Sequence, residues 1–386
     1  MAAMQDAPDR IPISVLTGFL GSGKTTLLAK LVKRPEMSNT ALVINEFGEV
    51  GIDHMLVEKS DESVVVLDSG CLCCTVRSDL ADTLRELLKR RYFKEIPQFD
   101  RVMIETTGLA DPAPILHTLM TDPVIAARYR LDSVITTVDA ETGSNTLDKQ
   151  PESVKQAAVA DRLLLTKTDI ATPEKVAALE ARIAAINPAA DPIRVIQGEI
   201  NPDLLFGAGL WDPSKKIPDV AAWLREEAYA DGHDHHHHHD HDHGHDHGHE
   251  HHDHGHDHEH QEHGHGPHHH QHAHDVNRHD DHIRSFCIRL EEPMDWDRFV
   301  DFMEALISTH GDNLLRVKGI LNIDGAKGPV AIHGVQHVFH PPAMLPHWPD
   351  SDHGSRIVMI CRDIAREPVE KMLKAFLDPD STQPLQ

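Results

Sequence analysis

Residues 18–25 of the chain, GFLGSGKT, are the sequence feature that most restricts its fold. They match the pattern G-x-x-x-x-G-K-[S/T] at every position, directly after an apolar run and directly before a helical pattern. In such a loop the glycines let successive backbone N–H groups converge on phosphate oxygens at the N-terminus of a helix. The sequence therefore predicts a strand, a phosphate-binding loop and a helix, in that order.

Short β-rich runs alternate with helical patterns through the first part of the chain. Continuous apolar runs such as VMIE and VITTV are typical of strands that are covered on both faces. We therefore expect an α/β domain with a mostly parallel sheet. The predicted strands cover residues 13–17, 41–45, 64–67, 101–105, 133–138 and 162–166, and the predicted helices cover 24–33, 78–90 and 173–186.

Strand patterns dominate the last part of the chain. They predict strands at residues 283–290, 314–323, 330–333, 335–340 and 356–360, with helices only at 296–307 and 369–376. Many strands with two helices indicate a smaller C-terminal α+β domain.

Histidine is concentrated between these two parts. Of the 34 His in the chain, 26 lie between His233 and His282, interleaved with Asp, Glu and Gly and nearly without apolar side chains. Such a segment cannot bury enough surface to offset the entropy lost on ordering, so we expect a disordered linker. The predicted organisation is a first domain over residues 1–230, a linker over 231–282 and a second domain over 283–380.

The charge of the chain argues against several classes of protein. With 37 Lys and Arg against 62 Asp and Glu, the formal net charge is −25, so nucleic acids and anionic membranes would be repelled. No stretch approaches the roughly 18 apolar residues of a membrane span, and the first residues lack the pattern of a secretory signal. We therefore expect a cytoplasmic protein that binds neither nucleic acid nor membrane.

Two acidic residues compete for the position beside the phosphate loop. Glu105 and Asp139 each follow an apolar strand, and ligands of parallel sheets bind at the carboxyl ends of strands. Lys24 would reach the β- and γ-phosphates, and the hydroxyl of Thr25 would ligate Mg²⁺. The sequence leaves the choice between the two acids open.

The segment Thr166-Lys167-Thr168-Asp169 follows a predicted strand and is the candidate base-binding segment. The carboxylate of Asp169 can accept two hydrogen bonds from the N1–H and N2–H₂ groups of guanine, which adenine does not offer. The stem of Lys167 would cover one face of the base. The alternative is an ordinary loop whose Asp caps a helix, but downstream of a phosphate loop we favour guanine, and hence GTP.

Three of the five cysteines lie in one loop, GCLCC, after the predicted strand 64–67. Cys71 and Cys74 have the C-x-x-C spacing of a metal site, and Cys73 adds a third thiolate. Soft thiolates favour Zn²⁺ or Cu⁺. A fourth ligand would be Glu46, Glu49 or an exchangeable water. The alternatives are a redox pair and inert buried thiols.

Five motifs, in order, resemble the CobW family of metal-handling P-loop GTPases. They are the phosphate loop, NEFGE at 45–49, GCLCC at 70–74, ETTGLADP at 105–112 and TKTD at 166–169. LLRVKGI at 314–320 and GVQH at 334–337 resemble the C-terminal domain of that family. Relatives of the group serve urease and hydrogenase maturation, and several members act as zinc metallochaperones or in cobalamin synthesis.

The resemblance implies roles for individual residues. It assigns Glu105 to the Mg²⁺ and hydrolysis region, and Lys167 and Asp169 to guanine recognition. It also implies a zinc motif formed by Cys71, Cys73 and Cys74 with Glu46 or Glu49. The residues implied to bind the phosphates of GTP are Gly21, Gly23, Lys24, Thr25 and Thr26, and Gly18 and Ser22 of the same loop are also predicted to bind the nucleotide. In one departure, Thr166 stands where the guanine motif commonly begins with Asn, and we expect weaker nucleotide affinity from it.

These residues together predict a GTP-hydrolysing metallochaperone that releases Zn²⁺ to a client metalloprotein. The alternatives are a GTPase that delivers Co²⁺ in cobalamin synthesis and a protein that stores or buffers metal. The tract from His233 to His282 would serve as a metal reservoir, because a plain spacer needs no His. A homo-oligomer remains among the options.

Overall fold

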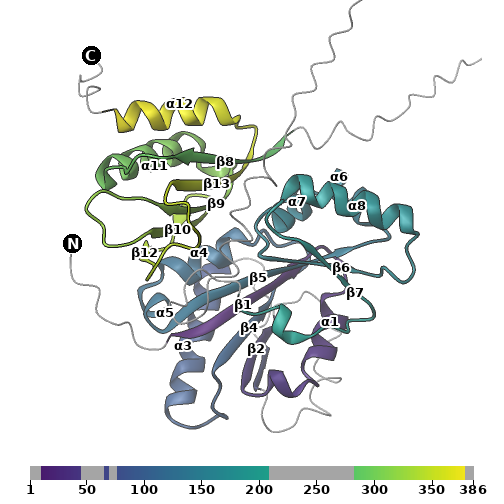
Figure 1. Ribbon diagram of the computed structural model, residues 1–386. Helices are drawn as coiled ribbons and strands as arrows, with labels where there is room; N and C mark the ends of the chain where they lie inside the picture. Colours follow the sequence, from purple (N-terminus) through teal and green to yellow (C-terminus); the bar gives the residue numbers. More distant parts are fainter. Residues whose placement is uncertain (1–9, 45–64, 69–75, 208–281, 379–386) are drawn as a thin grey trace, which may run out of the picture.

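The computed structural model describes residues 10–44, 65–68, 76–207 and 282–378, which form two units (Figure 1). The NEFGE segment, the GCLCC loop and the tract from His233 through residue 281 lie outside the described residues. No helix in the described ranges is both long enough and apolar enough to cross a membrane.

A seven-stranded parallel sheet forms the first unit, with the order β3-β2-β4-β1-β5-β6-β7. Every strand pair in this sheet is parallel, as the continuous apolar runs predicted. The strands are β1 (Ile11–Gly18), β2 (Thr40–Ile44), β3 (Val65–Asp68), β4 (Arg101–Glu105), β5 (Tyr129–Asp139), β6 (Arg162–Thr166) and β7 (Pro192–Val195).

Helices cover both faces of this sheet, because alternate strand residues point to opposite sides. Val15 packs in the cluster that contains residues of α3 and α4, whereas its neighbour Leu16 packs against α1. On the first of these faces, Leu163 and Leu165 pack with α7 and α8. The helices are α1 (Lys24–Leu31), α3 (Val76–Tyr92), α4 (Ala113–Thr121), α5 (Pro123–Arg128), α6 (Gly143–Lys149), α7 (Pro151–Ala158) and α8 (Pro173–Ile186).

The second unit is an antiparallel sheet of order β11-β10-β9-β13-β8, with β12 paired to β10. Phe302 of α11 and Leu373 of α12 pack with Val317 and Met359 on one face of it. The two helices therefore lie on one side, which confirms the predicted α+β fold. The elements are β8 (Ile283–Leu290), α11 (Trp296–His310), β9 (Leu314–Leu321), β10 (Val330–Val335), β11 (Val338–Phe339), β12 (Ala343–Met344), β13 (Ser355–Arg362) and α12 (Arg366–Leu377).

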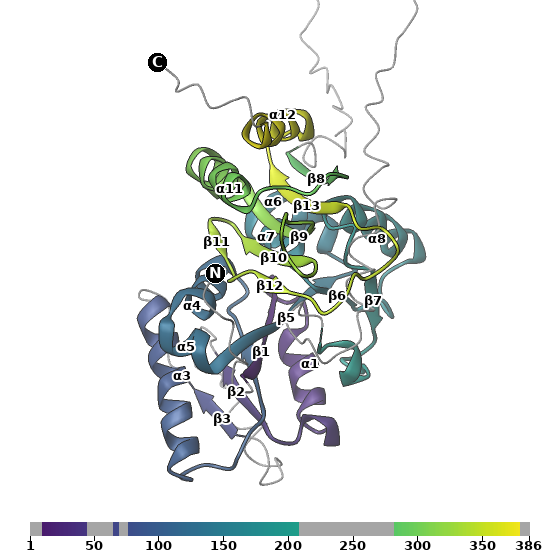
Figure 2. The ribbon, with the colours of Figure 1, turned by 60° about the vertical axis from the view of Figure 1, so that its left-hand side comes forward.

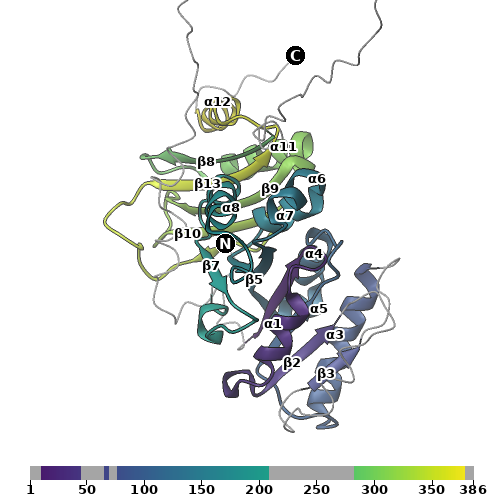
Figure 3. The same ribbon diagram turned by 90° about the vertical axis from the view of Figure 1, so that its right-hand side faces the viewer.

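The other face of the antiparallel sheet rests on the first unit (Figures 2 and 3). Leu315 and Ile360 join a cluster with Ala157 of α7 and Leu179 of α8. Near the turn between β10 and β11, Val335 packs into the same cluster as α4. The second unit is thus covered by helices on one side and by the first unit on the other.

One predicted strand is wrong. The sequence predicted separate strands at 330–333 and 335–340, but β10 continues through Val335 and only Val338 and Phe339 form β11. Gln336 adopts a left-handed φ of 53° between them, which turns the chain into a tight hairpin. Short 3₁₀ helices η1 (Pro35–Met37), η2 (Pro202–Leu204) and η3 (Gly311–Asn313) complete the described elements.

Candidate functional site

Four neighbouring strands bring the predicted nucleotide residues to one edge of the parallel sheet. In the sheet order β4-β1-β5-β6, these strands end at Glu105, Gly18, Asp139 and Thr166. Leu16 of β1 lies opposite Glu105, and Asp139 lies opposite Thr166. Because the strands are parallel, these carboxyl ends form one edge, which is where ligands bind in open α/β sheets.

The phosphate loop depends on the absence of side chains at its glycines. Gly18 has a φ of 140°, and a Cβ there would lie only 2.4 Å from the carbonyl oxygen of Thr137. Gly23, with a φ of 94°, stands directly before α1. Between them, the hydroxyls of Ser22 and Thr137 lie 2.7 Å apart and tie the loop to β5. The loop is therefore held against the sheet while its backbone turns toward the helix N-terminus.

The cationic end of Lys24 is held inside this loop. Its Nζ donates hydrogen bonds to the carbonyl oxygens of Gly18 (2.7 Å) and Phe19 (3.2 Å), and the residue is only 7% exposed. Thr25 and Thr26 follow it in the exposed first turn of α1. A helix N-terminus with a fixed ammonium group beside it is suited to bind a phosphate chain.

The structure separates the two competing acids. The hydroxyl of Thr25 donates to Oε1 of Glu105 across 3.5 Å. Asp139 has different partners: its Oδ2 lies 2.5 Å from the Nζ of Lys167, and its Oδ1 accepts from the backbone N–H of Glu141. Glu105 thus lies on the phosphate side of the edge, and Asp139 lies on the side of the TKTD segment.

Thr166 makes a contact that the sequence did not predict. Its hydroxyl donates to the backbone carbonyl of Ser22 (2.7 Å), so the TKTD segment is fastened directly to the phosphate loop. Lys167 follows with a left-handed φ of 58°, and Asp169 is exposed in the turn that leads to α8. Such a contact needs only a short side-chain donor at the end of β6, and nothing in the sequence shows which backbone carbonyl accepts its hydrogen bond.

The predicted metal-binding segments begin at the same edge of the sheet. β2 ends at Ile44, directly before Asn45, and β3 ends at Asp68, two residues before Gly70. Ile44 lies opposite Glu105 on one side and Asp68 on the other. With strands about 4.8 Å apart, Asp68 lies roughly 10 Å from Glu105 across the sheet. Glu46, Glu49, Cys71, Cys73 and Cys74 lie outside the described residues.

Other metal ligands do not converge in the described part of the chain. Within it, no three His, Cys, Asp or Glu side chains are placed to hold one metal ion. Cys287 and Cys361 are buried in the second unit, as expected for core thiols, and burial raises the pKa of Cys361 to about 12. His282, the last residue of the tract, lies at the surface with its Nδ1 2.5 Å from the Oδ1 of Asp363.

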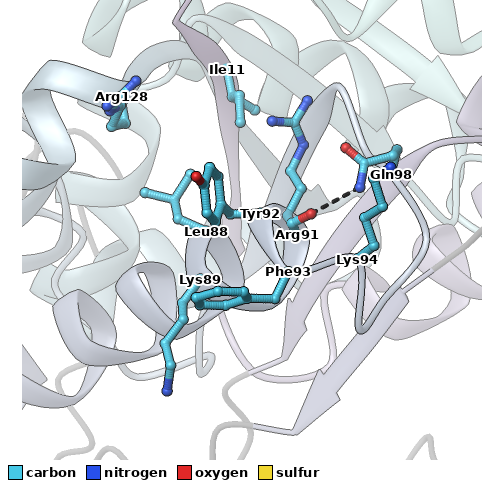
Figure 4. A pocket seen from close by; sticks show the side chains of 9 residues that line it. All are labelled: Ile11, Leu88, Lys89, Arg91, Tyr92, Phe93, Lys94, Gln98 and Arg128. Atoms are coloured by element: carbon cyan, nitrogen blue, oxygen red, sulfur yellow. Dashed lines mark hydrogen bonds between the residues drawn. The ribbon is translucent and has the colours of Figure 1, made fainter.

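A surface hollow of about 640 Å³ lies at the opposite edge of the sheet (Figure 4). Its lining includes Ile11, the first residue of β1, with Tyr92 and Phe93 at the end of α3. Since β1 runs for eight residues, this hollow is roughly 26 Å from the phosphate loop. It therefore has no part in the nucleotide site.

Comparison with known proteins agrees with these features. Residues 12–194 match the family described as CobW/HypB/UreG, nucleotide-binding domain, and residues 283–377 match the Cobalamin synthesis protein cobW C-terminal domain. The zinc chaperone YjiA of Escherichia coli is 32% identical over 360 residues, which cover 93% of this chain and 96% of YjiA. The chain belongs to the CobW family of P-loop GTPases.

A solved structure extends the likeness to three dimensions, and a second relative matches in sequence. The crystal structure of Zn(II)-bound YjiA GTPase from E. coli superposes with a TM-score of 0.62 at 26% identity, covering 95% of this chain and 99% of that one. The zinc-regulated GTPase metalloprotein activator 1 of Schizosaccharomyces pombe is 32% identical over 200 residues, or 50% of this chain and 47% of that protein. Both units of the chain, including their order, are therefore those of the CobW family.

Proposed function

We propose that this protein is a GTP-driven metallochaperone that captures Zn²⁺ on the GCLCC loop and passes it to a client metalloprotein. The observation that carries the proposal is that the nucleotide site and the predicted metal-binding segments start at the same edge of the parallel sheet. The strands that lead into the NEFGE and GCLCC segments end at the edge that carries the phosphate loop, with Ile44 directly opposite Glu105. The names of the relatives, a zinc chaperone and a zinc-regulated metalloprotein activator, point in the same direction.

The proposed binding of the phosphates rests on the contacts around α1. Lys24 leaves the carbonyls of its own loop to meet the β- and γ-phosphates, and the N-terminus of α1 supplies the backbone donors. Two hard oxygen donors, the Thr25 hydroxyl and the Glu105 carboxylate, lie side by side and suit Mg²⁺. When bound, Mg²⁺ would neutralise charge that develops on the phosphates. Glu105, rather than Asp139, fits this position.

The proposed binding of the guanine base rests on the TKTD segment. Asp139 holds the ammonium of Lys167, which fixes the direction of the lysine stem beside the base position. Asp169 then accepts from the guanine edge. Because the Thr166 hydroxyl joins this segment to the phosphate loop, base and phosphates are bound in a fixed spatial relation.

The proposed coupling of GTP hydrolysis to metal release rests on the acidic segment NEFGE. Glu46 or Glu49 would complete the thiolate site of Cys71, Cys73 and Cys74 while GTP is bound, and loss of the γ-phosphate would withdraw that ligand. Thiolates prefer Zn²⁺ over hard cations. Co²⁺ is the second candidate cargo, and the match to a cobalamin synthesis domain favours including it in the test.

We further propose a cytoplasmic setting and an accessory role for the tract from His233 to His282. Its imidazoles hold a reserve of metal close to the protein without taking part in GTP hydrolysis. The partner is the client metalloprotein, since a chain of net charge −25 repels nucleic acids and anionic membranes. Self-association of the chain is a separate question that sedimentation of the purified protein answers.

The decisive experiment measures metal affinity in the two nucleotide states. Zn²⁺ and, separately, Co²⁺ are titrated against a competing chromophoric chelator, with GDP or with a non-hydrolysable GTP analogue bound. The protein carries a deletion of residues 233–281, so that metal bound by the histidine tract does not contribute to the titration. We expect at least tenfold tighter Zn²⁺ binding with the GTP analogue, and loss of that difference in a Cys71/Cys73/Cys74→Ser variant.

A matched control uses the two core thiols. Cys287→Ser with Cys361→Ser removes the two buried thiols of the second unit and should leave the nucleotide-dependent affinity unchanged. Equal Zn²⁺ affinities in both nucleotide states would rule out the coupling. A larger nucleotide effect for Co²⁺ than for Zn²⁺ would favour the cobalt function instead.

A further inference from the structure

Helix α7 lies between the nucleotide edge and the second unit. On one side it contacts residues 108–111, which follow Glu105 and belong to the ETTGLADP motif. On the other side its C-terminal end meets β9 of the antiparallel sheet, where Leu315 packs with Ala157 and Ala158. Neither contact was foreseen from the sequence, and both are made by buried groups.

The first contact is made by Gln156, which is fully buried. Its Nε2 donates to the backbone carbonyl oxygens of Gly108 (3.2 Å) and Ala110 (3.0 Å). Lys155 adds an ion pair to Asp111 at 2.6 Å. Because a carbonyl accepts and cannot donate, the amide nitrogen of Gln156 must face this loop.

The loop that Gln156 holds is packed directly on the phosphate loop. A Cβ on Gly108 would lie 2.6 Å from the backbone nitrogen of Leu20, so the two backbones are in contact with no space between them. Upstream, the backbone N–H of Thr106 donates to the carbonyl of Leu16 at 2.9 Å. A displacement of Gly108 must therefore move the donors of the phosphate loop or open a gap beside them.

The second contact fixes the residues that directly follow α7. The guanidinium of Arg316, from β9, donates to the carbonyl of Val159 and to the carboxylate of Asp161. Lys318 donates to the same carboxylate at 2.8 Å, and Asp161 also accepts from the backbone N–H of Val134 at 2.9 Å. Arg316 is 5% exposed and Lys318 6%, so this contact is shielded from solvent and salt.

We propose that Gln156 is a positioning residue for GTP hydrolysis, and that Arg316 acts on the same loop through α7. The second unit thereby sets how closely Gly108 is held against Leu20, and with it the alignment of the phosphate site. This inference rests on the proposed nucleotide site. It adds a residue and a route by which the antiparallel sheet influences the rate.

The test compares steady-state GTP hydrolysis by the full chain with Gln156→Met, which keeps the length of the side chain and removes both donors. We expect kcat to fall about tenfold while KM for GTP changes less than threefold, since misalignment costs rate more than binding. The matched control is Gln98→Met, whose amide makes one hydrogen bond at the far edge of the sheet. It should leave kcat unchanged.

Arg316→Met should lower kcat about threefold, and Arg316→Lys should restore part of it. If both residues act through α7, the double variant with Gln156→Met hydrolyses GTP no more slowly than Gln156→Met alone. A fully multiplicative effect would mean that Arg316 acts elsewhere. Melting temperatures and hydrogen exchange of residues 106–111 are measured for each variant, so that kcat is referred to folded protein.

The outcomes separate the inference from its foundation. If Lys24→Ala hydrolyses GTP normally, the nucleotide site itself is misassigned. If Lys24→Ala is inactive but Gln156→Met keeps wild-type kcat and only melts earlier, Gln156 is purely structural and the inference is overturned.

Discussion

The two sheets place their polar side chains in opposite ways. In the parallel sheet Glu105, Asp139 and Thr166 stand at the carboxyl ends of strands, beside the phosphate loop. In the antiparallel sheet Arg316 and Lys318 stand within β9 and are buried against Asp161. Both sets are buried, but the first lies around the phosphate loop, whereas the second joins the two units.

The buried charges at the interface shift one another's ionisation. Burial alone raises the pKa of Asp161, but the charges of Arg316 and Lys318 outweigh it and hold that pKa well below its usual range. Burial and the neighbouring Arg316 lower the pKa of Lys318 to about 8, although Asp161 opposes the shift. The interface thus needs Asp161 as an anion, because it balances two cations that have left water.

The largest expected effect is at the phosphate loop. Lys24→Ala should reduce kcat/KM for GTP hydrolysis about a thousandfold, because the only buried ammonium at the phosphate loop, among the described residues, is removed. Lys33→Ala, an exposed lysine just after α1, is the control and should retain full activity. Hydrolysis is followed as phosphate release at saturating and limiting GTP.

The next effect is at the buried contact. Asp161→Asn keeps the shape of the side chain but leaves Arg316 and Lys318 without a counter-charge, and should destabilise the protein by about 3 kcal/mol. Glu370→Gln, which breaks a partly exposed pair with Arg366, should cost less than about 0.5 kcal/mol. Urea unfolding of both variants measures this. Similar decreases in the free energy of unfolding for the two variants would show that the buried ion pairs stabilise the protein no more than the partly exposed one.

The interface should also respond to acid. Burial, then the charge of Arg10, lowers the pKa of His340 to about 4, and burial first, then Arg316, lowers that of His333. As the pH falls, His340 therefore becomes protonated in the unfolded chain before it does so in the folded protein. The stability from neutral His340 is fully present above about pH 6.5 and is lost toward pH 4, on the order of 2 kcal/mol.

His340→Gln should flatten this part of the pH dependence, and His310→Gln, at the exposed end of α11, should not. The measurement is the free energy of unfolding at pH 7, 5.5 and 4.5 for the three proteins. A wild-type slope that persists in His340→Gln would assign the acid sensitivity to another group.

The smallest effect concerns the link between the TKTD segment and the phosphate loop. Thr166→Val removes the hydroxyl that binds the carbonyl of Ser22 and should weaken GTP binding about fivefold, or about 1 kcal/mol. Thr146→Val, which removes an exposed hydroxyl from α6, is the control. Unchanged nucleotide affinity in Thr166→Val would mean that the base and phosphate segments do not need this connection.

Prediction from sequence succeeded where a pattern is long or strict. The apolar strands around the phosphate loop and α8 with its Leu179 stripe were identified because they are periodic and contiguous. α4, α5, α6 and α7 and the strand β7 were missed. They are short, and α7, which has eight residues, buries Ala157 and Gln156 rather than a row of large apolar side chains.

The sequence alone determined what depends on consecutive residues. A phosphate loop needs glycines and one lysine at fixed spacing, so it can be read directly, and the three cysteines of the GCLCC loop predict a thiolate site in the same way. The tertiary structure decided which distant residues meet. Glu105 rather than Asp139 lies beside Thr25, Thr166 reaches Ser22, and Arg316 reaches Asp161, because strand order and the docking of two sheets bring together residues that are far apart in the chain.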